Sequence, residues 1–489
     1  MPDKLQSLLT NLSQRQIIGL FLGPVLFFIL LIIEQPADMP SGSIQVAAVA
    51  ILMATYWMSE AIPIPATALM PIVLFPLLGV MPTAKVTLSY GNHLIFLFMG
   101  GFLIAMSIEK WQLHKRIALR TILLVGVSAN QIILGFMLAT AFLSAWISNT
   151  ATAMMMVTIG LAVIKQAQLD KPDLQNKSDF ASALMLGIAY SASIGGIATL
   201  IGTPPNAILA GIIEANFNYT IGFAQWMAFA TPLSIVMLII CWLYLTHIAF
   251  HAEFDQLPGG KNSIKTQLKN LGPMSTPEKK VLSVFILVAA GWLIRGLFDI
   301  PALHSVNDAS IAIFGALLLF MIPADFKKGQ FLLDWQTAKN IPWDIMILFG
   351  GGFALASGFA HSGLTEWIAR HLIALEGMNI VVIVLMIVLL VIFLTEITSN
   401  TATSSLLLPV IGAFAVALHI HPLYLMVAVA LSASFAFMLP VATPPNAIIF
   451  SSRQITIPQM AKAGIWLNII GSILITLFVI FYLNRIFDL

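Results

Sequence analysis

Two short polar motifs, each present twice inside apolar sequence, have the residue types that bind ions. Ser148-Asn149-Thr150 recurs at 399–401, and Thr203-Pro204-Pro205-Asn206 recurs at 443–446. Proline has no N–H group and interrupts a helix, so the second motif predicts breaks that leave carbonyl and N–H groups without helical partners. Freed carbonyls, with hydroxyl and amide oxygens, can replace the water around a small hard cation, whereas N–H groups at a helix start attract anions. Each copy therefore offers ligands for a cation beside donors for an anion.

The charge of an anion bound at these motifs would have to be met from outside them. No lysine or arginine lies within either copy, so bound cations, helix ends and neutral hydrogen bonds would hold the anion. Cation and anion binding would then depend on each other. Two such half-sites would suit an anion with two separated negative groups, although Ser, Thr and Asn also act as packing contacts between membrane helices.

The two motifs recur in the same order, which indicates an internal duplication. The copies of the first motif are offset by 251 residues and those of the second by 240. A weaker echo precedes each pair, at 98–103 and 349–354. Interrupted apolar segments at matching positions of two halves are typical of inverted-repeat membrane proteins, whose site lies where the repeats meet.

The composition defines the environment of the chain. Of 489 residues, 59% are hydrophobic and 9% charged, with a mean hydropathy of +0.96, whereas soluble domains carry about 25% charged residues. A net charge of +2 excludes the cationic surface that binds nucleic acid, and the single cysteine, Cys241, excludes a disulfide framework. Because apolar stretches near the roughly 20 residues that cross a bilayer recur throughout, we predict an all-α polytopic membrane protein.

Polar breaks in the apolar sequence predict about eleven transmembrane helices and two opposed re-entrant hairpins. With the N-terminus in the cytoplasm and the C-terminus outside, all but four of the 23 lysines and arginines lie on the cytoplasmic side, as the positive-inside rule requires. Equivalent segments of the two halves then run in opposite directions. The predicted organisation is a first span at 1–33, a first repeat at 34–250 with a cytoplasmic-side hairpin near 121–168 and a broken helix near 181–217, a cytoplasmic connector at 251–278, and a second repeat at 279–489 with an outer-side hairpin near 379–418 and a broken helix near 424–450.

The paired motifs resemble those of the divalent anion/sodium symporter family, which contains bacterial dicarboxylate transporters and mammalian sodium–dicarboxylate and citrate carriers. The stretch from Ala433 to Asn446 also resembles the family's sodium/sulfate signature, with Ile449 where that signature has valine. Residues 57–65 resemble its junction between the second and third spans.

The resemblance implies the residues of the site. A first sodium site would comprise Ser144, Ser148, Asn149 and the backbone near Gly202, and a second would comprise Thr395, Thr398, Asn400 and the backbone near Ala442. The substrate carboxylates would be held by Asn149, Thr150, Asn400 and Thr401, with Thr203, Pro204, Thr443 and Pro444 lining the site.

The resemblance also implies an activity. The expected protein is not an enzyme but a symporter that imports C4-dicarboxylates such as succinate, malate and fumarate with two or more Na+. It would be a homodimer in a bacterial inner membrane, in which a transport domain moves against a fixed scaffold as an elevator.

Several alternatives stay open at this point. The same fold suits a sodium-independent dicarboxylate exchanger, or a symporter of citrate or sulfate. An intramembrane enzyme would need a nucleophile–base pair or paired carboxylates at membrane depth, and a channel would not need two opposed hairpins. Glu396, beside the second motif, is expected either to accept hydrogen bonds from hairpin N–H groups or to couple protons. In the first case Glu396→Gln should be tolerated.

Overall fold

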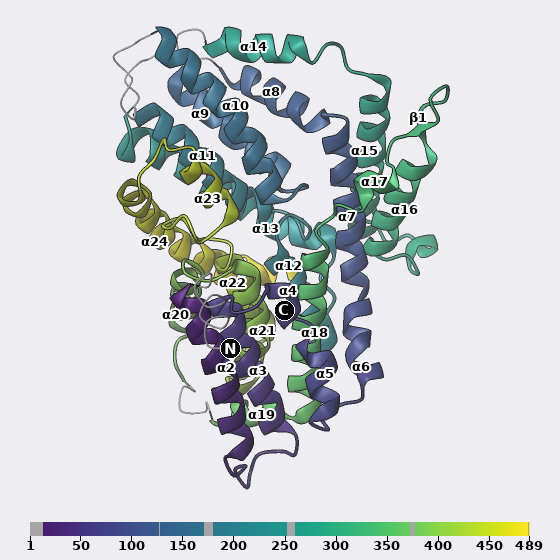
Figure 1. Cartoon of the computed structure of the whole chain (residues 1–489), viewed down its shortest axis with the longest axis vertical. Coiled ribbons are helices and arrows are strands. Elements are labelled where there is room, and N and C mark those ends of the chain that lie inside the picture. The colour runs from purple at the N-terminus through teal and green to yellow at the C-terminus, as the bar shows by residue number, and fades with distance from the viewer. Residues whose placement is uncertain (1–12, 127, 171–178, 252–259, 372–376, 488) are drawn as a thin grey trace, which may run out of the picture.

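A computed structural model describes residues 13–126, 128–170, 179–251, 260–371, 377–487 and 489 (Figure 1). Parts of the predicted first span, first hairpin and connector, at 1–12, 127 and 252–259, lie outside the described residues, as do Lys4, Lys171 and Lys177 of the orientation argument. The described chain is almost entirely helical, and its strands are one short antiparallel pair, β1 (Pro323–Asp325) and β2 (Gln330–Phe331). The predicted all-α class is confirmed.

Seven segments among the described residues are long and apolar enough to cross a membrane. Helices suit this environment because they bond all their backbone groups internally. The first of them exposes Ile18, Phe21, Val25, Phe28 and Ile32, which follow one face at helical spacing. The segments are α2 (Gln14–Ile32), α6 (Thr83–Leu88) continuing through η1 (Ser89–Gly91) into α7 (His93–Lys110), α13 (Phe223–Tyr244) with η3 (Leu245–Ala249), α15 (Thr276–Leu297), α18 (Trp343–Ser362), α21 (Asn400–Ala417) and α24 (Ile457–Phe481).

The remaining helices are shorter or interrupted. Several end at a polar turn where the sequence predicts a hairpin tip or a helix break, so they do not need the length of a full span. They are α3 (Ser43–Ser59), α4 (Ile64–Thr67), α5 (Met70–Leu77), α8 (Leu113–Val125), α9 (Ala129–Ser144), α10 (Asn149–Asp170), α11 (Asp179–Gly196), α12 (Pro204–Phe217), α14 (Gly260–Asn270), η4 (Pro301–Leu303), α16 (Asp308–Met321), α17 (Trp335–Ala338), α19 (Leu364–His371), α20 (Ile380–Thr395), α22 (Pro422–Ser432), α23 (Pro444–Ser451) and α25 (Leu483–Phe487).

Helix α11 lies at the centre of the part of the molecule that carries the motifs. It is buried from Phe180 to Gly196 and packs against α9, α10, α13 and α23 (Figure 1). The buried Tyr190 hydroxyl donates to the Phe437 carbonyl at 2.7 Å. Elements of both halves of the sequence therefore form one packed unit.

A second group of helices stands beside this unit. Apolar side chains of α2, α3 and α5 form a separate buried cluster with α18, and α7 packs along α16. In Figure 1, α7, α15 and α16 run along one side of the molecule, while α8 and α14 lie across its end.

Candidate functional site

Each Ser-Asn-Thr motif forms the tip of a helical hairpin. Helix α9 ends at Ser144 and α10 begins at Asn149, and in the second half α20 ends at Thr395 and α21 begins at Asn400. The Ser148 hydroxyl accepts a hydrogen bond from the Ala151 N–H at 3.2 Å, which caps the start of α10. In both halves the motif asparagine is thus the first residue of the returning helix.

Oxygen atoms converge behind the first tip. The Ser144 hydroxyl lies 2.5 Å from Asn149 Oδ1 and donates to the Ala192 carbonyl at 2.7 Å. The Asn149 amide also faces the Gly202 carbonyl, which its nitrogen would meet at 3.2 Å if the amide were turned. With the amide oxygen inward, hydroxyl, amide and carbonyl oxygens lie close together, and oxygens of these kinds are the ligands that a hard cation takes.

Glycine lets the backbone approach this cluster. A Cβ atom on Gly202 would lie 2.3 Å from the Gly196 carbonyl oxygen, and one on Gly196 would lie 2.6 Å from Asn149 Oδ1. Both distances are far below contact, so a larger residue at either position would displace the helix break or the hairpin tip.

A matching cluster lies behind the second tip. The Thr395 hydroxyl donates to Asn400 Oδ1 at 2.7 Å and lies 3.2 Å from the Ala433 carbonyl. These contacts repeat those of Ser144 with Asn149 and Ala192. One difference between the copies adds a contact: Thr398 stands where the first half has Ile147 and shares a 2.7 Å hydrogen bond with Thr403.

The asparagine side chain of each Thr-Pro-Pro-Asn motif donates hydrogen bonds to backbone carbonyls at its own helix break. Asn206 Nδ2 donates to the Thr199 carbonyl at 2.7 Å and to the Ile197 carbonyl at 3.3 Å. Asn446 Nδ2 donates to the carbonyls of Ala436 and Leu439, both at 3.0 Å. These amides hold carbonyls that the break leaves without helical partners, a role that the motif spacing alone does not reveal.

The two tips and the two breaks line one cavity of about 460 Å³. Ser144 and Thr395 are fully buried behind the cavity wall and contact it through Asn149 and Asn400. The structure thus brings all the sequence-predicted site residues to one place. Those in the lining are Ser148, Asn149, Thr150, Gly202, Thr203, Pro204, Thr398, Asn400, Thr401, Ala442, Thr443 and Pro444.

The cavity also contains residues that the sequence analysis missed. Arg15, at the start of α2, and Glu60, just after α3, are its charged lining residues within the described part of the chain. The Arg15 guanidinium donates to the Met58 carbonyl, and Glu60 has a left-handed backbone with φ 53°. Phe98 and Phe102 of α7 add apolar surface. No local pattern identifies these residues, because they reach the cavity only through long-range packing.

Glu396 is buried and accepts four hydrogen bonds. Its Oε1 accepts from the N–H groups of Phe437 and Met438 at 2.8 and 2.9 Å and from Asn468 Nδ2 at 2.7 Å, and its Oε2 accepts from the Leu439 N–H at 3.0 Å. These N–H groups belong to the break between α22 and α23 rather than to a hairpin. A carboxylate, which only accepts, suits an environment made of donors.

Helices long and apolar enough to cross a membrane, with two similar helix breaks around one cavity, indicate a multi-pass membrane transporter. The comparison with known families gives the particular group. Residues 14–489 match the family described as the sodium:sulfate symporter transmembrane region, and the chain belongs to this family.

Curated relatives match over nearly the whole chain. The sodium-dependent dicarboxylate transporter SdcS of Staphylococcus aureus strain USA300 is 48% identical over 484 residues, covering 97% of this chain and 92% of that protein. SdcS of strain MRSA252 is 47% identical over the same shares.

Two solved structures share the fold at low sequence identity. MtrF of Neisseria gonorrhoeae matches with a TM-score of 0.56 and 12% identity over 92% of this chain and 97% of that chain. YdaH of Alcanivorax borkumensis matches with a TM-score of 0.58 and 14% identity over 96% of this chain and 99% of that chain.

Proposed function

We propose that this protein is a sodium-coupled symporter of C4-dicarboxylates such as succinate, malate and fumarate. The observation that carries the proposal is the single cavity lined by both copies of both motifs, with an oxygen cluster behind each hairpin tip. A relative that is 48% identical over 484 residues is named a sodium-dependent dicarboxylate transporter.

The geometry supports one sodium site and one carboxylate-binding group at each of the two hairpins. One sodium ion would bind at Ser144, Ser148, Asn149 and the Gly202 carbonyl, and another at Thr395, Thr398, Asn400 and the backbone near Ala442. Asn149 with Thr150 and Asn400 with Thr401 would each donate hydrogen bonds to one carboxylate. The two sodium ions would then supply most of the positive charge facing the dianion. The ions would bind poorly without the dianion, and the dianion would bind poorly without the ions.

The side to which the cavity opens follows from the proposed orientation. Arg15 and Glu60 lie at the end of the α2–α3 pair where the chain enters α2, which is the cytoplasmic end if the N-terminus is inside a bacterial inner membrane. The structure would then represent an inward-facing state of an elevator movement. The proposal also includes the domain boundaries expected from the sequence and a homodimer. Chemical cross-linking in membranes would test the dimer.

The decisive experiment is uptake of labelled succinate into proteoliposomes under an inward sodium gradient, with choline replacing sodium in the control. Uptake that requires sodium supports symport. Uptake that ignores sodium but requires dicarboxylate inside the vesicles would identify an exchanger. If succinate is not transported, labelled citrate and sulfate under the same gradient decide whether another anion is the substrate.

A further inference from the structure

A second cavity lies behind the first hairpin tip, outside the proposed transport site. It has a volume of about 690 Å³, within the range of about 300–1,000 Å³ typical of ligand pockets. Ser148 and Thr150 line both cavities, so the tip forms the wall between them. Most of the other lining residues belong to α8, α10 and α14.

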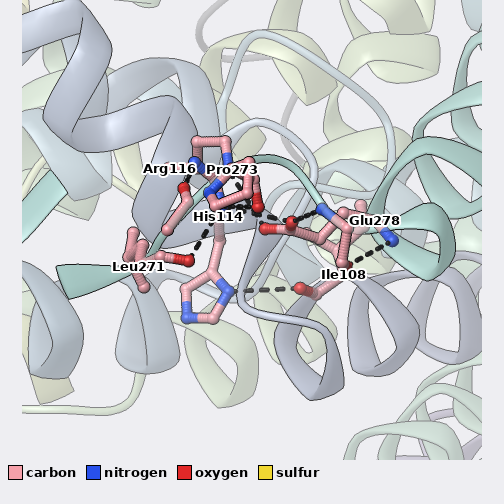
Figure 2. Close-up of polar contacts among 8 residues, drawn as sticks. Ile108, His114, Arg116, Leu271, Pro273 and Glu278 are labelled. Carbon is pink, nitrogen blue, oxygen red and sulfur yellow. Dashed lines mark hydrogen bonds and ion pairs between the residues drawn. The ribbon is translucent and has the colours of Figure 1, made fainter. Parts of the chain in front are cut away.

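One wall of this cavity is anchored to the start of α15 and to the residues just before it. Arg116 of α8 forms a two-point ion pair with Glu278, with distances of 3.1 and 3.2 Å, and donates to the Gly272 carbonyl at 2.9 Å (Figure 2). Both charged side chains are almost fully buried. The contact fixes α8 to the residues that follow α14, while α10 forms the opposite wall.

The wall of the cavity is mostly apolar and contains one buried polar group without a partner among the described residues. Thr152 has 2% of its surface exposed, and its hydroxyl has no hydrogen-bond partner among the described residues. Its repeat counterpart, Thr403, is bonded to Thr398 at 2.7 Å, but Ile147 stands in the place of Thr398 in the first half. The Thr152 hydroxyl is therefore left unpaired within the wall of the cavity, buried from its interior.

Two positive groups and one carboxylate lie at this cavity. Lys115 is half-buried in its wall and forms no ion pair within the described part of the chain. The first turn of α10, from Thr150 to Thr152, adds the positive end of a 22-residue helix. Glu109, an exposed residue, also lines the cavity.

An exposed apolar path leads into the cavity along α10. Met154, Thr158 and Ala162 follow one face at intervals of four residues, line the cavity and are exposed. Opposite them lies α14, whose Gln267 and Asn270 contribute amides. A pocket with a cation at one end and an apolar channel open to the outside of the helix bundle fits an acyl chain with an anionic head.

We infer that this cavity is a second ligand site that binds an anionic acyl lipid, with the head group at Lys115 and the chain along α10. Its effect on transport depends on the proposed function, because a ligand between α10 and the anchored α8 would restrain the first hairpin tip. Occupancy is expected to slow uptake.

Binding is measured first, since it does not depend on transport. The purified full-length protein in detergent is titrated with labelled phosphatidylglycerol or labelled oleate, which separates a phospholipid from a free fatty acid as the source of the anionic chain. Lys115→Gln should weaken binding about fivefold, the effect of losing one cationic contact. Arg120→Gln is the matched control, because Arg120 is exposed on the same helix and does not line the cavity.

Thr158→Trp, which fills the channel, provides a second variant in case Lys115→Gln folds poorly. Uptake is then compared in phosphatidylcholine vesicles with and without the lipid that binds. Slower uptake in the wild type and in Arg120→Gln, but not in Thr158→Trp, supports the inference. Equal binding by the wild type, Lys115→Gln and Thr158→Trp would overturn it, whether or not the protein transports succinate.

Discussion

Asn149 and Asn400 each join a hairpin tip, an oxygen cluster and the cavity. Alanine at either position removes an amide oxygen from the proposed cation site and a donor from the anion site. Hydrogen bonds to charged groups are worth about 1.5–3 kcal/mol, so sodium-driven uptake should fall at least about tenfold. Asn340→Ala, at an exposed asparagine, should leave uptake unchanged, and near-normal uptake by Asn149→Ala or Asn400→Ala would refute the site.

The contacts of Glu396 change the expectation for Glu396→Gln. A glutamine has one acceptor oxygen, so it can satisfy Phe437, Met438 and Asn468 only by presenting its own N–H₂ group to the Leu439 N–H. An unsatisfied buried donor costs about 1–3 kcal/mol. We expect a lower melting temperature and reduced uptake, both absent in the exposed control Glu366→Gln. Unchanged stability combined with a lost pH dependence of uptake would instead indicate proton coupling.

Arg15 is a cation in a cavity otherwise lined by neutral residues and Glu60. Its charge should attract a dianion to the mouth without contributing to the sodium sites. Arg15→Gln is expected to raise KM for succinate and to weaken its dependence on ionic strength, with the maximal rate and sodium dependence retained. Arg15→Lys, which keeps the charge, should restore KM, and failure of that rescue would leave Arg15 a purely structural contact to Met58.

At the scale of elements, the buried ion pair between Arg116 of α8 and Glu278 of α15 should stabilise the folded protein measurably. Removing one partner of a buried ion pair costs about 3–5 kcal/mol, so Arg116→Gln should lower the melting temperature of the purified protein. Arg120→Gln, on the exposed face of the same helix, should not. A melting temperature that is equal in both variants would show that the pair adds no net stability.

Elements defined by local chemistry are those that the sequence predicts well. Proline pairs stand at the start of α12 and α23, and both tip asparagines start a helix, because these residues act on their own backbone. Arg15 in the cavity and the Arg116–Glu278 pair depend on segments more than 40 and 160 residues apart that meet only in the folded chain. The roles of Asn206 and Asn446 were missed for another reason, since an amide can serve a ligand or the backbone equally well.

At the scale of the whole molecule, accessibility tests the orientation and the open side together. Cys241 is fully buried, and Val441 lines the transport cavity with 64% of its surface exposed. In Cys241→Ala membranes, Val441→Cys should react with a membrane-impermeant maleimide in inside-out vesicles, and sodium with succinate should protect it. Labelling only in right-side-out vesicles would reverse the orientation or place the protein in an outward-facing state.

The bond from Tyr190 to Phe437 has a consequence for how the protein is made. The two residues are 247 positions apart, and at about 5–20 residues per second their synthesis is separated by roughly 12–50 s. During that interval α11 sits in the membrane with a hydroxyl that has not yet met its acceptor, and the surfaces that later receive α23 are uncovered. The packing of the first half of the chain is therefore completed only after the second half has left the ribosome.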